Sequence, residues 1–474
     1  MAVCNERTIT AYNLKKTYGE TVLKIKEFVL KYKISIICAC CALLCAAGII
    51  AACVIGGGDK IAPDKKTQEH LIGDVSSSAV KIDKYFIYGT HLHLEGTLSL
   101  EGFPDWERMG LVLRDADGTE KEIYLITEKR TDTVSFKSSQ EINTGLCLDE
   151  IPCGDYCILF KVVCGGKTQY VSCENLTEYS FTDYYTVTNT GKNNRVLIGF
   201  EDYYNSEKYI PCLAMKVEAA RLPENVYDVV IDAGHGTSDP GAVALGHNEA
   251  DITIDYALSI KDALEAKGLK VYLSRNGSET GDEMSSYAAY SKNGRINGAC
   301  ASRAKFCLSV HLNSTASENP TGGVEIYCPS NSDLAFAKNL ADSLVKNVGI
   351  PYSQHGYNRV ENGVYVRTFT QDDIADSAQY AEEGGYEKYP NLSTDTTYYY
   401  IIRELGGIAT GAYVDGRNPE YGTNLYYNAN YGMESYLAEI GYICVEEDLN
   451  LILNAKQSYV NTIADCIANE LSVG

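Results

Sequence analysis

Two hydrophobic patterns divide the chain beyond residue 76. From Ser77 to Pro223, short runs rich in Val, Ile, Tyr, Phe and Thr alternate with turn signals such as Gly165-Gly166. This spacing is typical of antiparallel sheets packed face to face. We therefore expect an all-β, sandwich-like domain over residues 77–223.

From Val226 onward, strand patterns alternate with helix patterns. Apolar residues recur at helical spacing over Asp251–Lys267 and stop at Gly268, and strands are predicted over 269–274, 305–310 and 324–327. A closing helix is predicted over 446–471. The alternation predicts an α/β domain over 224–474, a sheet with helices on its faces. Residues 350–433 form a long insertion rich in Tyr, Gly and acidic residues. The sequence does not decide whether this insertion is a lid, a regulatory segment or an inert loop.

The segment Ile34–Ile55 carries no charge over 22 residues, and a membrane-spanning helix needs about 20. Seven basic residues precede it, whereas acidic and basic residues mix after it. The positive-inside rule then predicts a cytoplasmic tail (1–33), a single-pass anchor (34–56), a linker (57–76) and an extracytoplasmic remainder in the cell envelope. Lipidation at Cys53, in a loose lipoprotein-like box, is the minor alternative to this uncleaved anchor.

The net charge and the cysteine pattern argue against several classes of function. The net charge of −22 argues against nucleic-acid binding, which needs clustered Lys and Arg. Eleven of the 17 cysteines follow the predicted anchor, and none of them forms a C-x-x-C pair that would indicate a structural zinc or a redox couple. The sequence does not decide whether a disulfide joins two of the cysteines between Cys147 and Cys173.

The candidate chemistry lies at the ends of the predicted strands. The run Val226–Gly236 (VYDVVIDAGHG) ends in His235, Glu249 opens the first long helix, and His311 follows another apolar run. Two histidines and a glutamate form an open zinc site of the kind that leaves a position for water or substrate. This set predicts metal-assisted hydrolysis, with His247 as the nearest rival ligand.

The order and flanks of these residues resemble the zinc-dependent N-acetylmuramoyl-L-alanine amidases of bacterial cell walls, over about the second half of the chain. The resemblance implies Zn²⁺ on His235, Glu249 and His311, and includes the turn Asp239–Ala242. It also implies that Glu439 is the catalytic glutamate, which its apolar neighbours support, because burying a carboxylate needs a partner or a role. Substrate contacts are expected at three further positions, namely Arg295, Asn313 and Arg403.

The sequence also departs from the family pattern. Glu434 stands where a proline is usual, Cys444-Val445 replaces a Ser/Thr-Asn pair, and Cys300 replaces an asparagine. These changes affect supporting positions and not the metal ligands.

The resemblance implies a membrane-bound hydrolase that acts on peptidoglycan at the bond between N-acetylmuramic acid and L-alanine. Cleavage of a peptide bond within the stem is an alternative on the same fold. A non-catalytic or autoinhibited envelope scaffold that binds peptidoglycan is the alternative from another class. The β domain has three interpretations, as a wall-binding module, a contact for an envelope protein or a spacer.

Overall fold

The computed structural model of the 474-residue chain describes residues 61–75, 77–174, 184–187, 193–221, 224–279, 294–317, 320–384, 388, 392–406 and 431–472. The cytoplasmic tail and the anchor predicted at 34–56 lie outside these ranges. Among the helices that are described, none is long and apolar enough to cross a membrane. The anchor therefore stays a prediction.

The second half of the predicted linker is a packed helix and not a tether. Helix α2 (Lys65–Ile72) begins after Asp64, whose carboxylate accepts hydrogen bonds from the main-chain N–H groups of Lys66 and Thr67. Leu71 and Ile72 are fully buried in an apolar cluster with residues of the neighbouring strands. The tether prediction was wrong for this stretch, because a short helix with two adjacent core residues shows little periodicity.

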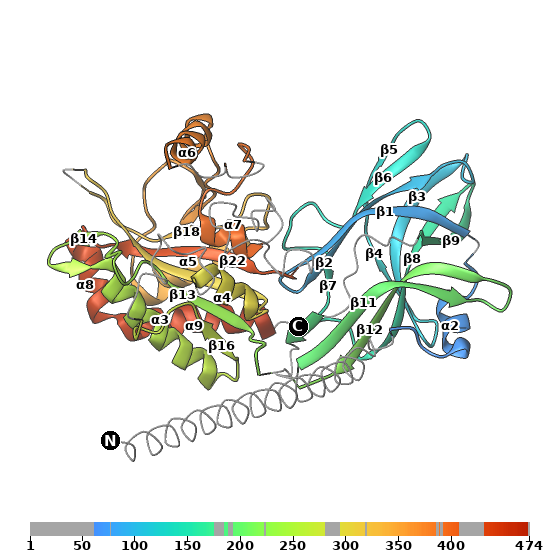
Figure 1. Cartoon of the computed structure of the whole chain (residues 1–474), viewed down its shortest axis with the longest axis horizontal. Helices are drawn as coiled ribbons and strands as arrows, with labels where there is room; N and C mark the ends of the chain where they lie inside the picture. The colour runs from blue at the N-terminus through green and yellow to red at the C-terminus, as the bar shows by residue number, and fades with distance from the viewer. Residues whose placement is uncertain are drawn as a thin grey trace, which may run out of the picture. The chain divides into compact units, whose positions relative to one another are not determined.

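The segment that follows α2 is all β (Figure 1). Its strands are β1 (Ser77–Tyr88), β2 (His91–Ser99), β3 (Trp106–Asp115), β4 (Glu120–Ile123), β5 (Ile126–Lys129), β6 (Thr133–Lys137), β7 (Leu146–Cys147), β8 (Gly154–Cys164), β9 (Lys167–Cys173), β10 (Tyr184–Val187), β11 (Asn193–Tyr204) and β12 (Tyr209–Ala219).

These strands form one continuous sheet that curls around its core. The order is β10-β11-β12-β8-β9-β1-β2-β6-β5, with β3 also paired to β8. Phe136 on β6 and Phe160 on β8 are far apart in this order, yet their ring centroids lie 5.1 Å apart. The arms of the sheet thus face each other across one apolar core, as in a sandwich, but they are joined by the parallel pairing of β1 with β9.

The second half of the described chain contains a seven-stranded sheet with helices. Its elements are β13 (Val229–Ala233), β14 (Val243–Ala244), β15 (His247–Asn248), α3 (Glu249–Ala266), β16 (Val271–Leu273), α4 (Arg295–Ala301), β17 (Phe306–Asn313), β18 (Glu325–Tyr327), α5 (Ala335–Val348), β19 (Arg359–Glu361), β20 (Val364–Tyr365), α6 (Gln371–Gly384), α7 (Tyr400–Gly406), β21 (Tyr431–Gly432), β22 (Glu434–Tyr442), α8 (Glu446–Asn454) and α9 (Lys456–Ser472).

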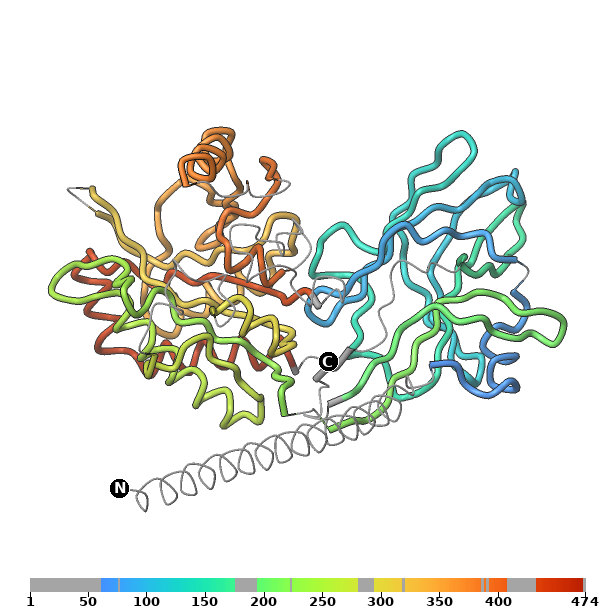
Figure 2. Tube along the Cα trace, viewed as in Figure 1, coloured from blue at the N-terminus to red at the C-terminus, as the bar shows by residue number. Residues whose placement is uncertain are grey.

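The sheet has the order β16-β13-β17-β22-β18-β20-β19, and its first four strands are parallel. Figure 2 shows by colour that β22, late in the chain, lies among strands from much earlier. Successive strand residues pack on opposite faces. One face packs against α3, α5, α8 and α9, and the other against α4 and α7. The predicted sheet with helices on both faces is confirmed.

The closing helix and the insertion differ in detail from the expectation. The helix predicted over 446–471 is two helices, α8 and α9, with the break at Ala455. Within the insertion, β19, β20, α6 and α7 are formed, while 385–387, 389–391 and 407–430 lie outside the described residues.

A short strand joins the two sheets. In β21, Tyr431 and Gly432 pair with Ile87 and Tyr88 of β1, and β22 begins two residues later. The Glu434 carboxylate accepts a hydrogen bond from the Asn143 amide at 3.2 Å. The strand that carries Glu439 is therefore attached at its start to the β region.

Candidate active site

His235 lies just beyond the end of β13, in a tight turn. Its backbone has a positive φ of 59°, an unusual conformation for a residue with a side chain. The preceding Gly234 lies against the ring of His311, because a Cβ at this position would come within 2.4 Å of the His311 Cε1 atom. The glycine in the DAGHG sequence therefore lets the two imidazoles approach.

Glu249 is the first residue of α3 and lies almost fully buried. Its Oε2 atom accepts a hydrogen bond from the main-chain N–H of Ala242 at 3.0 Å, and its Oε1 atom accepts one from that of Leu312 at 3.0 Å. Both carboxylate oxygens are thus held by the backbone, which fixes the side chain between the two histidines.

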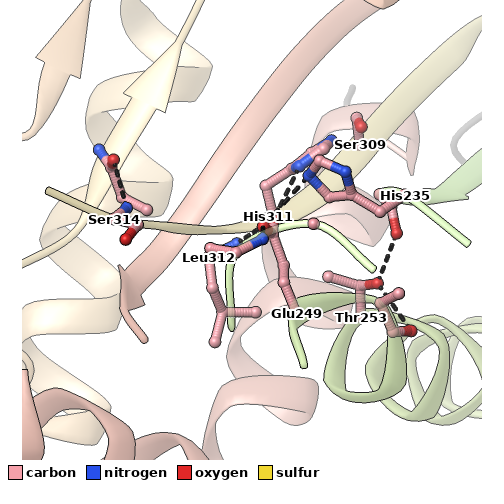
Figure 3. A network of polar contacts seen from close by, with 12 residues as sticks. His235, Glu249, Thr253, Ser309, His311, Leu312 and Ser314 are labelled. Carbon is pink, nitrogen blue, oxygen red and sulfur yellow. Dashed lines mark hydrogen bonds and ion pairs between the residues drawn. The ribbon is translucent and has the colours of Figure 1, made fainter. Parts of the chain in front are cut away.

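The two histidines and Glu249 converge on one point (Figure 3). Glu249 Oε2 lies 3.1 Å from His235 Nε2, and Glu249 Oε1 lies 2.9 Å from His311 Nδ1. Among the described residues these form the one group of His, Cys, Asp or Glu side chains with ligand atoms within 4.8 Å of each other. The rival His247 is outside this group.

The contacts within the cluster shift the pKa values of Glu249 and His235. Burial works to raise the pKa of Glu249, but hydrogen bonds with His235 and His311 outweigh it and the pKa is lowered. Burial works to lower the pKa of His235, but its bonds to Glu249 and Asp239 outweigh it and the pKa is raised. Both shifts favour an ionised Glu249 beside a positive charge, so the metal-free site holds the proton of His235 more tightly than a free imidazole would.

A second layer of side chains holds the ligands. The Asp239 carboxylate lies 2.9 Å from Nδ1 of His235, which leaves Nε2 directed toward Glu249. Arg275 is buried and donates to the carbonyl oxygens of Gly234 (3.0 Å) and Ala250 (2.7 Å), and so ties β13 to α3.

Glu439 lies on β22, paired across the ladder with His311 of β17. It is buried, and its Oε2 atom has no hydrogen-bond partner within the described part of the chain. Burial, and after it the nearby carboxylates Glu249 and Glu325, raise the pKa of Glu439 well above the ordinary value. An unpartnered buried carboxyl beside a metal-type cluster is a candidate for proton transfer.

These groups surround a cavity of about 280 Å³. Its walls are formed by His235, Ala242, Glu249, His311, Leu312, Asn313, Ser314, Tyr399, Tyr400, Ile401, Leu437 and Glu439. The three metal-type side chains and Glu439 thus open onto a common space, and the insertion supplies one wall through Tyr399, Tyr400 and Ile401.

The three predicted substrate contacts occupy different positions. Asn313 lines the cavity, and its amide donates to Glu325 (2.9 Å) and to the Tyr442 hydroxyl (3.1 Å). Arg295 is fully buried and donates to Asp232 and to the carbonyl oxygens of Ala233 and His235.

Arg403 is also buried, and it donates to the carbonyl oxygens of Thr397 and Tyr398. Direct substrate contact does not fit either arginine, because their donor groups are enclosed and engaged by Asp232, by Glu404 and by main-chain carbonyl oxygens. They support the walls of the site: Arg295 supports the turn of His235, and Arg403 supports the segment that carries Tyr398 and Tyr399.

Two residues near the site were not singled out from the sequence. Glu325 accepts hydrogen bonds from Asn313, Tyr327, Ser353 and Tyr442, and it is the ladder partner of Glu439. Tyr399 forms part of the cavity wall. Glu325 had the signal that favoured Glu439, a carboxylate between apolar strand residues, whereas a tyrosine in a Tyr-rich insertion has no distinguishing signal.

The comparisons with known proteins cover mainly this second half. Residues 229–374 match the family described as N-acetylmuramoyl-L-alanine amidase (Amidase_3). N-acetylmuramoyl-L-alanine amidase LytC of Bacillus subtilis (strain 168) is 33% identical over 116 residues, 24% of this chain and 21% of that protein. The germination-specific N-acetylmuramoyl-L-alanine amidase of the same strain is 28% identical over 193 residues, 38% of this chain and 81% of that protein.

Among solved structures, N-acetylmuramoyl-L-alanine amidase AmiC2 of Nostoc punctiforme aligns with 52% of this chain and 95% of its own, at 20% identity and a TM-score of 0.30. The chain spans only about a fifth of the length of LytC, so the match concerns one region and not the whole relative. Residues 229–374 are thus an Amidase_3 domain, and the named relatives that align with this part of the chain are N-acetylmuramoyl-L-alanine amidases.

Proposed function

We propose that this protein hydrolyses the amide between N-acetylmuramic acid and L-alanine in peptidoglycan, with Zn²⁺ held by His235, Glu249 and His311 and with Glu439 carrying the proton. The observation that carries the proposal is the convergence of these four side chains on one cavity. The family match supports the same reaction class.

The residues of the site fit a zinc ion. Two imidazoles and one carboxylate are a donor set of catalytic zinc sites. Asp239 engages Nδ1 of His235, so Nε2 is left for a metal, as in sites where a carboxylate orients a histidine ligand. The lowered pKa of Glu249 and the raised pKa of His235 both indicate a place built for positive charge.

When bound, zinc supplies Lewis acidity, which polarises an amide carbonyl and makes water a stronger nucleophile at neutral pH. Glu439 takes a proton from the attacking water and returns it to the nitrogen of the departing amine. Its carboxyl suits this shuttle because burial and neighbouring carboxylates raise its pKa toward the range in which it can both accept and donate. Tyr399, Tyr400 and Leu437 limit access of bulk water.

We also propose that the enzyme acts outside the cytoplasmic membrane, anchored by residues 34–56. The uncharged stretch and the basic residues before it support this orientation. Peptidoglycan lies on that side of the membrane, so the proposed location and the proposed substrate agree.

The test is incubation of the whole chain with purified peptidoglycan, with and without zinc, beside the Glu439→Gln variant. Mass spectrometry should show peptides with a new N-terminal alanine that require both zinc and Glu439. Glu446→Gln, an exposed carboxylate at the start of α8, is the matched control and should retain activity. Cleavage inside the stem peptide would give other N-termini. Tight zinc binding without any product would favour a non-catalytic or autoinhibited scaffold.

A further inference from the structure

A basic side chain, Arg367, packs beside Tyr399, which lines the proposed active site, and has donor groups that the described residues do not fully use. Arg367 follows β20 by two residues, and its side chain is 27% exposed. Its main-chain carbonyl accepts a hydrogen bond from the N–H of Tyr398 at 2.9 Å. The pairing of Thr368 with Thr397 continues this contact, so the two segments run side by side.

The guanidinium of Arg367 is stacked on Tyr398, the neighbour in sequence of the cavity-lining Tyr399. Its Cζ atom lies 3.4 Å from the ring centroid of Tyr398 and 5.7 Å from that of Tyr399. Tyr399 itself lines the cavity together with Glu439. Stacking on a ring fixes the plane of a guanidinium and leaves its edge for hydrogen bonds, so less freedom is lost when a ligand binds.

The hydrogen-bonding capacity of Arg367 is only partly filled. Its guanidinium makes a side-chain hydrogen bond with Tyr399, whereas the Asp373 carboxylate oxygen is 3.9 Å away, beyond hydrogen-bond distance. Its Nε atom is buried and has no hydrogen-bond partner among the residues that the structure describes. Arg295 and Arg403, in contrast, are buried and have their donors engaged by the carboxylates of Asp232 and Glu404 and by main-chain carbonyl oxygens. Of the three arginines, Arg367 is thus the one with a partly exposed guanidinium that can take a ligand.

The charge of the cavity walls indicates which class of ligand Arg367 binds. Apart from the two histidines, the described lining residues include no basic side chain, while Glu249 and Glu439 are acidic. A carboxylate on a substrate therefore finds no lysine or arginine inside the cavity. The planar fork of an arginine matches the two oxygens of a carboxylate.

We propose that Arg367, stacked on Tyr398 beside Tyr399, is a subsite that binds a carboxylate of the peptide part of the substrate. The inference rests on the proposed function, because it assigns the peptide to this side of the cavity. It makes Arg367 a specificity-determining residue that favours acidic muramoyl peptides over the same peptides with the carboxylates amidated. Arg403 acts through the loop and has no direct part in this contact.

The experiment compares two synthetic muramoyl peptides that differ only in free against amidated carboxylates. The zinc-loaded whole chain is assayed as wild type, Arg367→Gln, Arg367→Lys and Arg359→Gln. Arg359 is exposed on the neighbouring β19 and controls for the loss of one positive charge. Binding of both peptides is also measured by calorimetry in the Glu439→Gln background, so that the result does not depend on turnover.

We expect the KM of wild type to be about tenfold lower for the acidic peptide than for the amidated one, which is the effect of one hydrogen bond between charged groups. Arg367→Gln should lose that preference with kcat nearly unchanged, Arg367→Lys should keep part of it, and Arg359→Gln should keep all of it. Equal weakening for both peptides in Arg367→Gln, or no preference in wild type, would overturn the subsite. If neither peptide is cleaved but the Arg367-dependent preference appears in binding, the proposed reaction fails while the subsite stands. If neither is cleaved nor bound, both proposals fail.

Discussion

His311 and Glu439 are paired positions on the neighbouring parallel strands β17 and β22. The carboxyl ends of parallel strands meet at one edge of a sheet, where binding sites form in open α/β folds. This pairing brings a proposed metal ligand and the proposed proton carrier, 128 positions apart in the sequence, into one site.

Replacement of Glu439 by glutamine should remove turnover and leave zinc binding intact. The amide keeps the size of the side chain but cannot accept and return a proton, so kcat should fall by about 10²–10⁴-fold. The measurement is the initial rate of peptide release beside the zinc content of the purified protein. A variant that retains a tenth or more of wild-type kcat would rule out Glu439 as the proton carrier.

Asp239→Asn should weaken zinc binding without preventing folding. Asp239 orients His235 through a 2.9 Å contact with Nδ1, and loss of such a contact lowers metal affinity by about 10–100-fold. Competition with a chelator measures the affinity. Asp262→Asn, with its side chain 81% exposed on α3, is the control and should bind zinc like wild type. Equal affinity in all three proteins would show that Asp239 has no role at the site.

Zinc affinity should fall as the pH falls through the raised pKa of His235. A histidine ligand must be neutral to bind a metal, and its bonds to Glu249 and Asp239 make the protonated form unusually stable in the metal-free protein. Protons should therefore compete with zinc at a pH above the ordinary histidine value of 6.5. Chelator competition between about pH 5.5 and pH 8 measures this. A pH-independent affinity, or a midpoint well below 6.5, would contradict it.

The sequence allowed prediction of the cluster of His235, Glu249 and His311 because its members lie at the ends of strands and at the start of a helix. His235 and His311 each follow an apolar run, and Glu249 opens a helix, so a parallel sheet brings all three to one edge. The structure agrees with each of these placements.

The roles of the arginines could not be predicted in this way. Arg295, Arg367 and Arg403 are the same residue type, and only tertiary packing decides which guanidinium is enclosed. For the same reason helix α2 was missed: its two core residues gain stability from distant strands, not from a local pattern.

Gly234→Ala should disrupt the zinc site more than it disrupts the fold. The new Cβ would come within 2.4–2.6 Å of three atoms of the His311 ring, so the imidazole must move out of line with Glu249. Overpacking of this kind costs about 1–3 kcal/mol of stability. Gly356→Ala is the matched control, because a Cβ added there would meet no described atom within 4 Å beyond its chain neighbours. Zinc titration and thermal unfolding of both variants provide the measurement, and normal zinc affinity in Gly234→Ala would contradict the packing argument.

Glu434 should make the metal-free protein less stable as the pH rises from about 4.5 to about 7. This glutamate is buried where β22 starts, in contact with Asn143 and Tyr436, and desolvation raises its pKa from 4.5 to about 7. The folded protein thus binds this proton more tightly than the unfolded chain does. Its stabilising contribution is complete below about pH 4.5 and is lost by about pH 7, a change on the order of 3 kcal/mol.

Glu434→Gln removes the titration but keeps an oxygen that can accept the hydrogen bond from Asn143. Urea unfolding in the presence of a chelator should therefore show a smaller decline in stability between about pH 5 and pH 8 than in wild type. Glu446→Gln, an exposed carboxylate at the start of α8, should retain the wild-type decline. If Glu434→Gln declines as steeply as the other two proteins, the carboxyl is not held protonated at this junction. The stability of the strand that carries Glu439 would then not depend on the charge of its first residue.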